Sequence, residues 1–374
     1  GISIMASIKL KGDTSGEITI SSPSVAGTNT LELQATSGTL ATTAQASIGM
    51  KNLIINGNMQ IAQRATSVTG IAASNIYRTI DRWRTDCLSV GTWTQTQDTD
   101  VPSGQGFAKS LKMDCTTANG SIASNSRLAI THRIEGFNVQ SLAKGTPDAK
   151  SITLSFWIKS NKTGTYIAEL FDSDNTRQVS SSYTVSVADT WEKKTITYAG
   201  DTSGVLANDN GIGLIPLFWF AAGSDFNSGT LNTSWGANVQ ANRAVGQVNL
   251  ADSTSNYINI TGVQLEVGTT ATPFEHLQYG QQLALCQRYY YVIPAGSYGF
   301  PCPSTGGFAY VQRYDFKVSM RASPTMNWNY SSSGNIAAIN LYSPNVDYVT
   351  AQYVGTGLAN VYWNLAISTA TAEL

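Results

Sequence analysis

The chain has 374 residues, of which 42% are hydrophobic and only 13% are charged, and its formal net charge is −1. This length is sufficient for two or three domains with a sizeable core. The near-neutral charge argues against a nucleic-acid-binding protein, which needs Lys and Arg to displace counterions. No apolar run approaches the roughly 18 residues of a membrane span. We therefore expect no nucleic-acid partner and no membrane insertion.

Residues 1–50 are rich in Ser, Thr and Gly and contain only short apolar pairs that alternate with polar residues. Such alternation predicts short strands, which are too small to build a core alone. Met5 is a candidate natural start, which would make Gly1–Ile4 a remnant or upstream sequence. The pairs are Ile8 with Leu10, Ile18 with Ile20, and Leu31 with Leu33.

Residues 51–280 carry repeated strand patterns. Residues 152–158 place Ile, Leu and Phe on one face and mainly polar residues on the other, and residues 183–187 alternate in the same way. Residues 214–222 form the longest apolar run, which fits a buried strand. Many short strands separated by Gly, Asn and Ser turns, with few helical stretches, predict an antiparallel β-sandwich.

The sandwich is expected to close on a strand and a hinge. Residues 256–267 alternate, which predicts a strand, and residues 268–273 end it. Residues 274–288 have a weak helical spacing, and residues 289–293 again read as strand. We therefore place a domain boundary near residue 280, within a short helical hinge.

Residues 281–374 are predicted to form a small, tyrosine-rich β domain. Residues 308–320 alternate clearly, and later candidate strands are 335–342, 346–354 and 358–367. From Tyr289 to the end lie 11 of the 17 tyrosines, and no Lys or Arg follows Arg321. This composition is typical of binding loops or of a subunit interface, and the sequence leaves both open.

Several motifs in the middle of the chain carry a family resemblance. The first is NLIINGN at residues 52–58, followed by Gln63, Arg64, Tyr77, Asp81, Arg82 and Trp83. The others are LSFWIKS at 154–160, DTWEKKTITYAGDT at 189–202 and VQLEVGTTATPFEHLQYGQQLALCQRYY at 263–290. Residues 51–291 thereby resemble a module of bacteriophage tail-fibre and related virion proteins, which is itself similar to jelly-roll carbohydrate-binding domains.

The resemblance implies a jelly roll for residues 51–280 and a place in the virion after assembly in the host cytoplasm. Residues 7–42 resemble an N-terminal element of phage fibre proteins, so residues 1–50 are expected to attach the chain to other virion proteins or to form a shaft. An edge hairpin packed on its own domain is the alternative. A homotrimer fits both the family and the uncharged C-terminal composition.

The sequence indicates no enzyme. The two histidines, His132 and His276, are expected to be structural, with His276 packing the hinge, and no nucleophile elbow, phosphate loop or HExxH motif is present. Glycoside cleavage needs only two facing carboxylates, so candidate acids exist. They are Glu169, Asp172, Asp174, Glu192 and Asp225.

No cofactor is expected. Cys87, Cys115, Cys286 and Cys302 lack the paired spacing of a zinc site and are predicted to be free, buried thiols. Residues 172–175 read as a turn between strands. Their clustered oxygens are a weak candidate for a calcium ion.

Aromatic residues are the candidate ligand contacts, because sugars stack flat C–H faces on rings and bond their hydroxyls to polar side chains at the rim. The polar segment 223–244 contains Phe226, Asn232 and Trp235, and Trp235 is either a plug over the sandwich end or an exposed platform. Trp93 is predicted to lie on an open sheet face. Trp157 is expected to pack in the core or against the second sheet, and Trp83 to be architectural.

In the last domain the adhesive candidates are Trp328, Tyr330, Tyr342 and Tyr348, whereas Trp363 is expected in the core. The favoured function is host attachment by a non-enzymatic virion fibre protein that binds a host surface glycan. The alternatives are a structural capsid-decorating or tail-assembly protein with an aromatic protein interface, and a glycan-cleaving enzyme.

Overall fold

The computed structural model describes residues 7–11, 17–21, 51–300, 309–334, 336–342, 344–355 and 361–374, and within them the side chains of 51–296, 309–329, 338–342, 344–354 and 365–374. The chain forms two compact units, Gly1–Gly49 and Met50–Leu374. In the first, β1 (Ser7–Lys11) and β2 (Glu17–Ser21) form an antiparallel hairpin with Ile8 opposite Ile20. This confirms the first two predicted strands, whereas Leu31–Leu33 lies outside the described residues.

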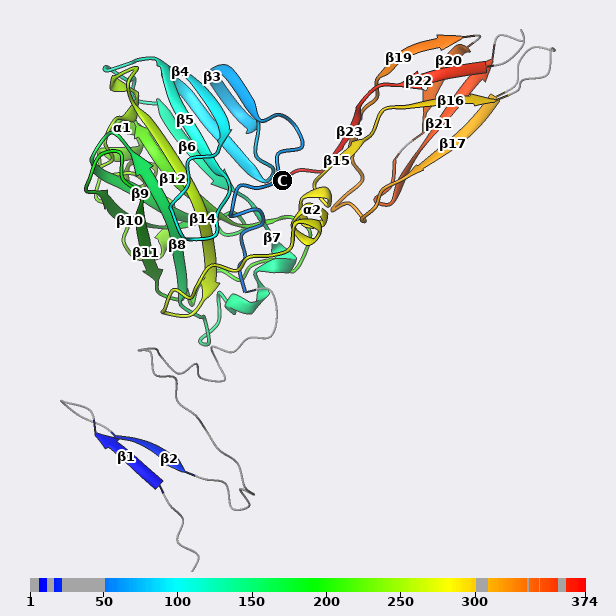
Figure 1. Ribbon diagram of the computed structural model, residues 1–374. Helices are drawn as coiled ribbons and strands as arrows, with labels where there is room; N and C mark the ends of the chain where they lie inside the picture. The colour runs from blue at the N-terminus through cyan, green and yellow to red at the C-terminus, as the bar shows by residue number, and fades with distance from the viewer. Residues whose placement is uncertain are drawn as a thin grey trace, which may run out of the picture. The chain divides into compact units, whose positions relative to one another are not determined.

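The second unit is almost entirely β, as the alternating patterns predict (Figure 1). Its larger part is one curled antiparallel sheet that folds into two layers. The strands are β3 (Ser67–Tyr77), β4 (Trp83–Asp98), β5 (Ser110–Thr117), β6 (Arg127–His132), β7 (Ile134–Glu135), β8 (Ile152–Ser160), β9 (Gly164–Asp172), β10 (Arg177–Val185), β11 (Glu192–Tyr198), β12 (Ile212–Ala222), β13 (Gly236–Ala237) and β14 (Tyr257–Val267). Short helical turns lie at α1 (Ser224–Asn227), Gly136–Asn138, Gln140–Leu142, Gln240–Asn242 and Leu250–Asp252.

Strand β4 belongs to both layers. Its second half pairs with β5 and continues the order β11-β8-β14-β5-β4, here called the first sheet. Its first half pairs with β6 and begins the order β4-β6-β12-β9-β10-β13, the second sheet. The strand turns from one layer to the other around Gly91, which has φ +76°, and a Cβ there would lie 1.8 Å from the Thr117 carbonyl oxygen. Only glycine fits this corner.

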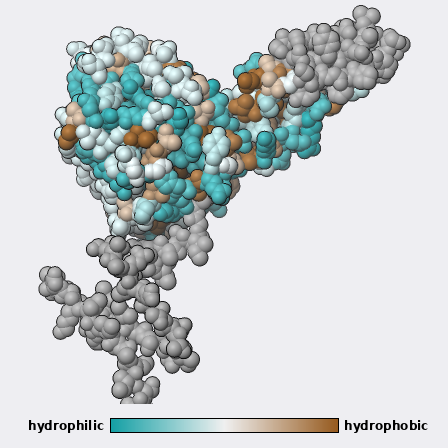
Figure 2. All heavy atoms as spheres, viewed as in Figure 1, coloured by the Kyte–Doolittle hydropathy of each residue, from teal (hydrophilic) through white to brown (hydrophobic). Residues whose placement is uncertain are grey.

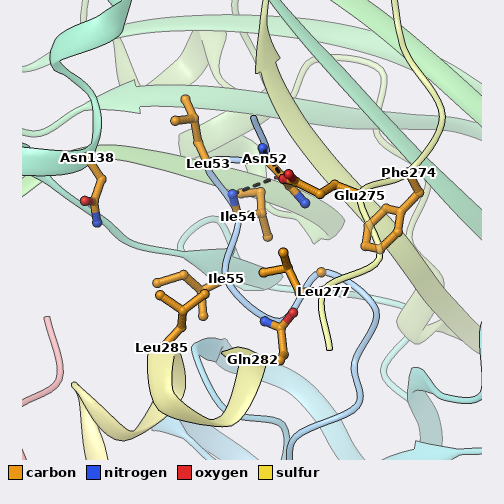
Figure 3. Close-up of a pocket in the computed structure, with 11 residues that line it drawn as sticks. Asn52, Leu53, Ile54, Ile55, Asn138, Phe274, Glu275, Leu277, Gln282 and Leu285 are labelled. Atoms are coloured by element: carbon orange, nitrogen blue, oxygen red, sulfur yellow. Dashed lines mark hydrogen bonds between the residues drawn. The ribbon is translucent and has the colours of Figure 1, made fainter. Parts of the chain in front are cut away.

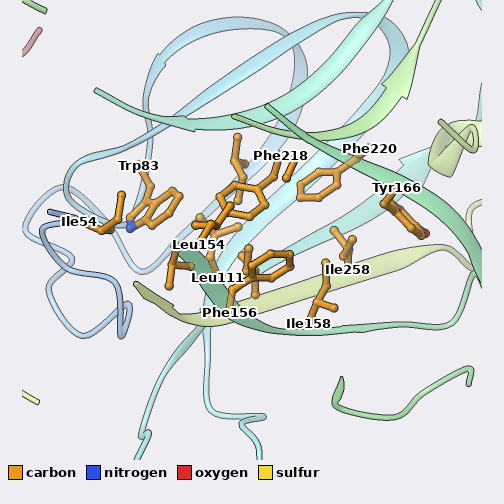
Figure 4. Close-up of a cluster of buried hydrophobic side chains, with 14 of the residues drawn as sticks. Ile54, Trp83, Leu111, Leu154, Phe156, Ile158, Tyr166, Phe218, Phe220 and Ile258 are labelled. Carbon is orange, nitrogen blue, oxygen red and sulfur yellow. The ribbon is translucent and has the colours of Figure 1, made fainter. Parts of the chain in front are cut away.

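The core lies between the two sheets (Figure 4). The apolar face predicted for residues 152–158 points into it, and alternate residues of the buried strand predicted at 214–222 do so too; Leu154, Phe156 and Phe218 are fully buried. Phe156 makes edge-to-face contacts with Phe218 and Tyr183, at centroid distances of 5.0 and 5.1 Å. Such aromatic pairs add specific geometry to the burial of apolar area, which stabilises the sandwich.

The family-like motifs at the two ends of the sandwich meet in space. The segment 51–57 runs beside β14, where Leu53 N donates to Leu265 O and Val263 N donates to Gly57 O, each at 2.9 Å. The Asn56 amide bonds the Ile61 and Asp81 carbonyls, and the Trp83 indole donates to Asn56 O at 3.0 Å. Trp83 is fully buried, so its predicted architectural role is confirmed.

Helix α2 (Tyr279–Gln287) follows the sandwich and confirms the predicted hinge helix, although it begins five residues later than the spacing indicates. Within the described residues, the remaining strands pair with one another in three small sheets. They are β15 (Tyr290–Ile293), β16 (Gly296–Phe300), β17 (Ala309–Asp315), β18 (Thr325–Asn327), β19 (Tyr330–Gly334), β20 (Ile336–Leu341), β21 (Tyr348–Gly355), β22 (Val361–Leu365) and β23 (Ser368–Thr371). Their core includes Tyr314, Val349 and Tyr353.

Buried charges join these last strands to the sandwich. The fully buried Arg82 pairs with Glu373, and its guanidinium carbon lies 3.5 Å from the ring centre of Tyr289. Arg288 and the Tyr289 hydroxyl both donate to Glu135. Because a buried ion that loses its partner is costly, these pairs specify how the C-terminal strands attach.

Of the four cysteines, the described three are free and buried, as predicted. Burial raises the pKa of the Cys286 thiol well above its usual value, which keeps it protonated. Cys302 lies outside the described residues.

Candidate functional site

The outer face of the second sheet is covered by the polar segment that contains the candidate ligand contacts Phe226, Asn232 and Trp235. Residues 223–244, here called the covering loop, place Phe226 of α1 against Trp219 of β12, with ring centres 5.3 Å apart. Phe226 is only 6% exposed and packs in a second apolar cluster with Ile167 and Ala244. The prediction that Phe226 contacts a ligand is therefore wrong, because its ring closes the sheet face.

An ion pair holds the covering loop in place. Glu169 of β9 is fully buried and accepts hydrogen bonds from Arg243 Nε at 2.9 Å and from the Trp219 indole at 2.8 Å. Burial raises the pKa of Glu169, and the charge and hydrogen bonds of Arg243 and the bond from Trp219 offset this only in part. Glu169 thus serves as a structural anchor and not as an exposed acid.

The outer face of the first sheet carries a hollow in place of a packed loop. Trp157 of β8 points outward and is half-buried, opposite Lys193 of β11 and Thr261 of β14. The expectation that Trp157 packs in the core or against the second sheet is wrong. Trp157 alternates with the apolar residues Phe156 and Ile158, and this alternation correctly indicates the outward face, since successive residues of a strand point to opposite faces.

Three more rings stand beside Trp157. Phe107, Phe274 and His276 contact one another, with ring centres 4.9 to 5.2 Å apart. Together with Trp157 they line a hollow of about 460 Å³, here called the aromatic hollow. Its remaining lining is mainly small or polar and consists of Gly104, Gln105, Ser155, Lys193, Gly262, Ala271, Thr272 and Pro273. Rings with polar neighbours in a concavity suit a ligand that is flat on one side and hydroxylated at its edge.

One wall of the aromatic hollow is the segment between β4 and β5. Asp100 in this segment accepts from Lys159 Nζ at 2.8 Å and from the Trp191 indole at 2.9 Å. Thr261 Oγ1 donates to Lys109 O at 2.7 Å. These bonds tie the segment to the first sheet and fix where Phe107 stands.

The other wall is the segment after β14. Thr272 donates from both its backbone nitrogen and its hydroxyl to Glu266, at 2.9 and 2.7 Å, and Glu275 N donates to the side chain of Gln264 at 2.9 Å. Gln264 and Glu266 are polar, buried residues of β14 that follow a register shift between Thr261 and Gln264. Their side chains bond to Thr272 and Glu275, and these hydrogen bonds hold the wall of the hollow in place.

The same wall contributes to a second, small hollow beside the start of the sandwich (Figure 3). The Glu275 carboxylate accepts from the backbone nitrogens of Lys51 and Asn52 at 3.0 and 2.9 Å. Phe274 lines both this hollow, of about 140 Å³, and the aromatic hollow. The small volume of this second hollow fits a packing defect better than a ligand site.

Trp235 lies in a separate hollow of about 360 Å³ with Arg177, Asp201 and Thr233. Its indole donates to Ala199 O at 2.9 Å, and its ring packs partly against the main core. Trp235 is therefore half-buried and covers part of the core, which supports the plug, while its role as a stacking platform stays a prediction. The backbone oxygen of the nearby Asn232 accepts from Ser180 N at 2.7 Å, and its side-chain amide donates to Gln178 O at 3.3 Å. Asn232 therefore bonds to β10.

The Lys144 ammonium pairs with the first carboxylate of the candidate calcium turn. Asp172 ends β9 and a turn follows, as predicted. The buried Lys144 donates to Asp172 at 2.5 Å, to Asp201 at 3.0 Å and to the carbonyls of Ser203 and Gly204 at 2.9 Å. Within the described ranges, no group of three or more His, Cys, Asp or Glu residues could hold a metal. Lys144 and Arg177 together pair with the carboxylates of Asp172 and Asp201.

The remaining aromatic candidates are distributed between core and surface. Trp93 is fully buried and its indole donates to Val90 O at 2.9 Å, so its predicted place on an open sheet face is wrong. Trp328 packs edge-to-face on Tyr314 and is half-buried. Tyr342 is 47% exposed, and the half-buried Tyr348 ring lies 3.8 Å from the Arg313 guanidinium carbon. The side chains of Tyr330 and Trp363 lie outside the described residues.

The two histidines differ sharply. His132 is buried against Trp83, and its Nε2 lies 3.1 Å from the Ile55 backbone oxygen. Burial and the Arg82 charge hold the pKa of His132 well below the usual value. This is the structural role that the sequence predicts. His276 is exposed and lies in the aromatic hollow, so the expectation that it packs the hinge is wrong.

The remaining candidate acids form hydrogen bonds or lie in a helical turn. Asp174 accepts from Ala207 N at 2.9 Å, and Glu192 accepts from Lys194 at 2.5 Å. Asp225 lies in the first turn of α1.

No helix in the described part of the chain is long and apolar enough to cross a membrane. On the side seen in Figure 2, apolar residues of the sandwich form only small scattered areas among polar ones.

No family model and no curated protein matches the chain. Among solved structures it is similar to the enzymatically active domain of tailspike protein 4 of bacteriophage CBA120, with 15% identity and a TM-score of 0.32, over 58% of this chain and 21% of that one. It is also similar to the carbohydrate-binding module TmCBM61 in complex with β-1,4-galactotriose (9%, TM-score 0.29, 58% and 99%). A third is a protein from Bacteroides thetaiotaomicron described as a "putative sugar binding protein" (13%, TM-score 0.30, 58% and 100%). These likenesses are too distant to assign a function.

Proposed function

We propose that this protein is a non-enzymatic virion fibre protein that attaches to a host surface glycan through its sandwich. The aromatic hollow is the observation that carries the proposal. It places Trp157, Phe107, Phe274 and His276 around one concavity with polar groups at the rim. A pyranose ring stacks its C–H face on an indole, and its hydroxyls bond to neighbouring polar groups.

A shallow hollow of this kind gives weak binding at a single site. Several copies on one particle raise the effective concentration and hence the avidity. The proposal therefore includes a homotrimer, with residues 1–50 joining other virion proteins, and the virion as its location after assembly in the host cytoplasm. The family-like motifs support this context.

The test is binding of fluorescently labelled purified protein to intact host cells, before and after periodate oxidation of surface sugars, with the oligomer mass measured on the same sample. Trp157→Ala is expected to lower cell binding by at least about tenfold, because a central tryptophan is a frequent hot spot. Phe137→Ala is the matched control, since Phe137 is 51% exposed and does not line the aromatic hollow.

Loss of binding after periodate treatment and in the Trp157 variant, with an unchanged Phe137 variant, supports the proposal. Equal binding by the Trp157 and Phe137 variants would place the glycan site elsewhere. A folded oligomer that does not bind cells would reject host attachment.

One observation favours the structural alternative for the C-terminal strands. Leu341 and Tyr342 are 40% and 47% exposed in the part of the chain after Arg321, which contains no Lys or Arg. An uncharged surface with exposed apolar groups suits contact with protein. A copy number set by the capsid lattice, measured on purified particles, would support this second role.

A further inference from the structure

We infer that the aromatic hollow takes an anionic saccharide, with Lys193 pairing the negative group while the sugar ring stacks on Trp157. This inference rests on the proposed glycan binding and names the chemical class of the ligand. The negative group is a carboxylate, sulfate or phosphate on the sugar, since all three suit an ammonium at the rim.

The first observation is the charge of the lining. Among the described residues that line the aromatic hollow, none is Asp or Glu, and Lys193 is the one fixed charge. The imidazole of His276 and the amide of Gln105 are further groups that can donate hydrogen bonds to an anion. A hollow with donors and no carboxylate favours an anionic ligand over a neutral one.

The second observation is that Lys193 differs from the other lysines of the first-sheet strands. Lys112 pairs with Asp114 at 2.9 Å, Lys159 with Asp100 at 2.8 Å and Lys194 with Glu192 at 2.5 Å. Lys193 has no carboxylate within 4.0 Å in the described part of the chain. Its ammonium is therefore available to a ligand without breaking an existing pair.

The third observation is position. Lys193 and Trp157 are directly opposite each other on neighbouring antiparallel strands, so their side chains rise on the same face of the sheet. A sugar stacked on the Trp157 ring then has its substituents within the reach of a lysine side chain. Lys193 is also exposed, so a ligand can approach it from solvent.

The experiment uses the full chain and immobilised matched pairs of saccharides. The pairs are oligogalacturonate with its methyl ester, chondroitin sulfate with its desulfated form, and sialyllactose with lactose. Each pair is measured at 20, 150 and 500 mM NaCl, and the cell-binding assay is repeated over the same salt series. Lys193→Met removes the charge and keeps the apolar stem. Lys150→Met is the control, because it changes the net charge equally at an exposed lysine outside the hollow.

We expect the acidic member of at least one pair to bind about threefold to tenfold more tightly than its neutral partner at low salt. That preference should shrink as salt rises, because salt screens an exposed pair. It should disappear in Lys193→Met and persist in Lys150→Met.

Equal or tighter binding of the neutral members overturns the inference. So does cell binding that neither salt nor Lys193→Met weakens, and in that case the proposed glycan binding still stands. A wild-type oligomer that binds none of the six saccharides and no cells overturns the proposed function itself. Trp157→Ala separates the two failures, because it lowers binding of any stacked sugar, whether charged or neutral.

Discussion

The two outer faces of the sandwich differ in how far loops cover them. Each carries an outward tryptophan, Trp219 on the second sheet and Trp157 on the first. Trp219 is 1% exposed beneath the covering loop, whereas Trp157 is half-buried beside a hollow of about 460 Å³. One tryptophan has therefore become core, and the other remains available to a ligand.

The difference comes from what the neighbouring loops place on each face. The covering loop brings Phe226 and Arg243, and Arg243 meets the buried Glu169. Over the first sheet, the two wall segments are tied down at their edges by Asp100 and Glu266, which leaves the middle uncovered. A buried ion pair thus seals one face, while hydrogen bonds at the rim keep the other concave.

The largest expected effect is on the sealed face. Glu169→Ala removes the partner of Arg243 and of the Trp219 indole, and we expect a loss of about 3–5 kcal/mol of unfolding free energy. Chemical denaturation measures this loss. Cell binding per folded molecule should not change, because the aromatic hollow lies on the other sheet. A loss below about 1 kcal/mol would show that the ion pair does not hold the covering loop.

The next effect concerns the open face. Gly262 has φ +61°, and a Cβ there would lie 2.5 Å from the Phe107 ring. Gly262→Ala should cost about 1–2 kcal/mol from the left-handed backbone alone, and it should also lower cell binding several-fold by displacing Phe107.

Gly70→Ala is the control for this backbone cost. Gly70 has φ +68° but meets nothing within 4 Å, so only the conformational cost remains. Equal cell binding by the two alanine variants would remove Phe107 from the proposed site. Melting temperatures and the cell-binding assay together decide the comparison.

A pH effect should follow from the sealed face. Burial raises the pKa of Glu169 above the ordinary 4.5, so the folded state holds this proton more tightly than the unfolded state. Its stabilising contribution is full below pH 4.5 and is lost as the pH rises through the folded-state pKa, at a slope of up to about 1.4 kcal/mol per unit.

Glu169→Gln removes this pH-dependent contribution to the unfolding free energy, because an amide does not titrate. Relative to that variant, the wild-type protein should be most stable near pH 4 and should lose the advantage as the pH rises toward 7. Urea denaturation at several pH values measures the difference between the two proteins. A constant difference would mean that Glu169 has the same pKa in the folded and unfolded states.

The smallest effect tests Trp235 against Trp157. Trp235→Phe removes the indole bond to Ala199 O, which should cost roughly 1 kcal/mol in stability. Cell binding should stay within about twofold of the wild-type value. A tenfold loss of binding in this variant would move the candidate site to the Trp235 hollow.

Much of the fold could be predicted from the sequence. The alternation of residues 152–158, the apolar run 214–222 and the strand ending at Val267 each correspond to an observed strand. Strand ends were less predictable. The pattern 308–320 predicts one strand, but β17 ends at Asp315, because Phe316 N bonds to Asp347 O outside the ladder.

The candidate site could be predicted only in part. Trp235 does line a hollow, but Trp93 and Phe226 are buried, and the sequence pattern does not identify Trp157 or His276 as ligand contacts. Periodicity assigns a residue to one of two faces of a strand. It does not say whether a loop from elsewhere in the chain will cover that face.

The sequence by itself determined the all-β class, the positions of most strands, the hinge helix and the architectural roles of Trp83 and His132, because these follow from local alternation and from motifs in the chain. Only the tertiary structure decided which tryptophan stays accessible. Phe107, Trp157 and Phe274 are far apart in the sequence and line one hollow only because β14 lies between β8 and β5 in the first sheet. The aromatic hollow and its unpaired lysine are therefore properties of strand order and loop placement.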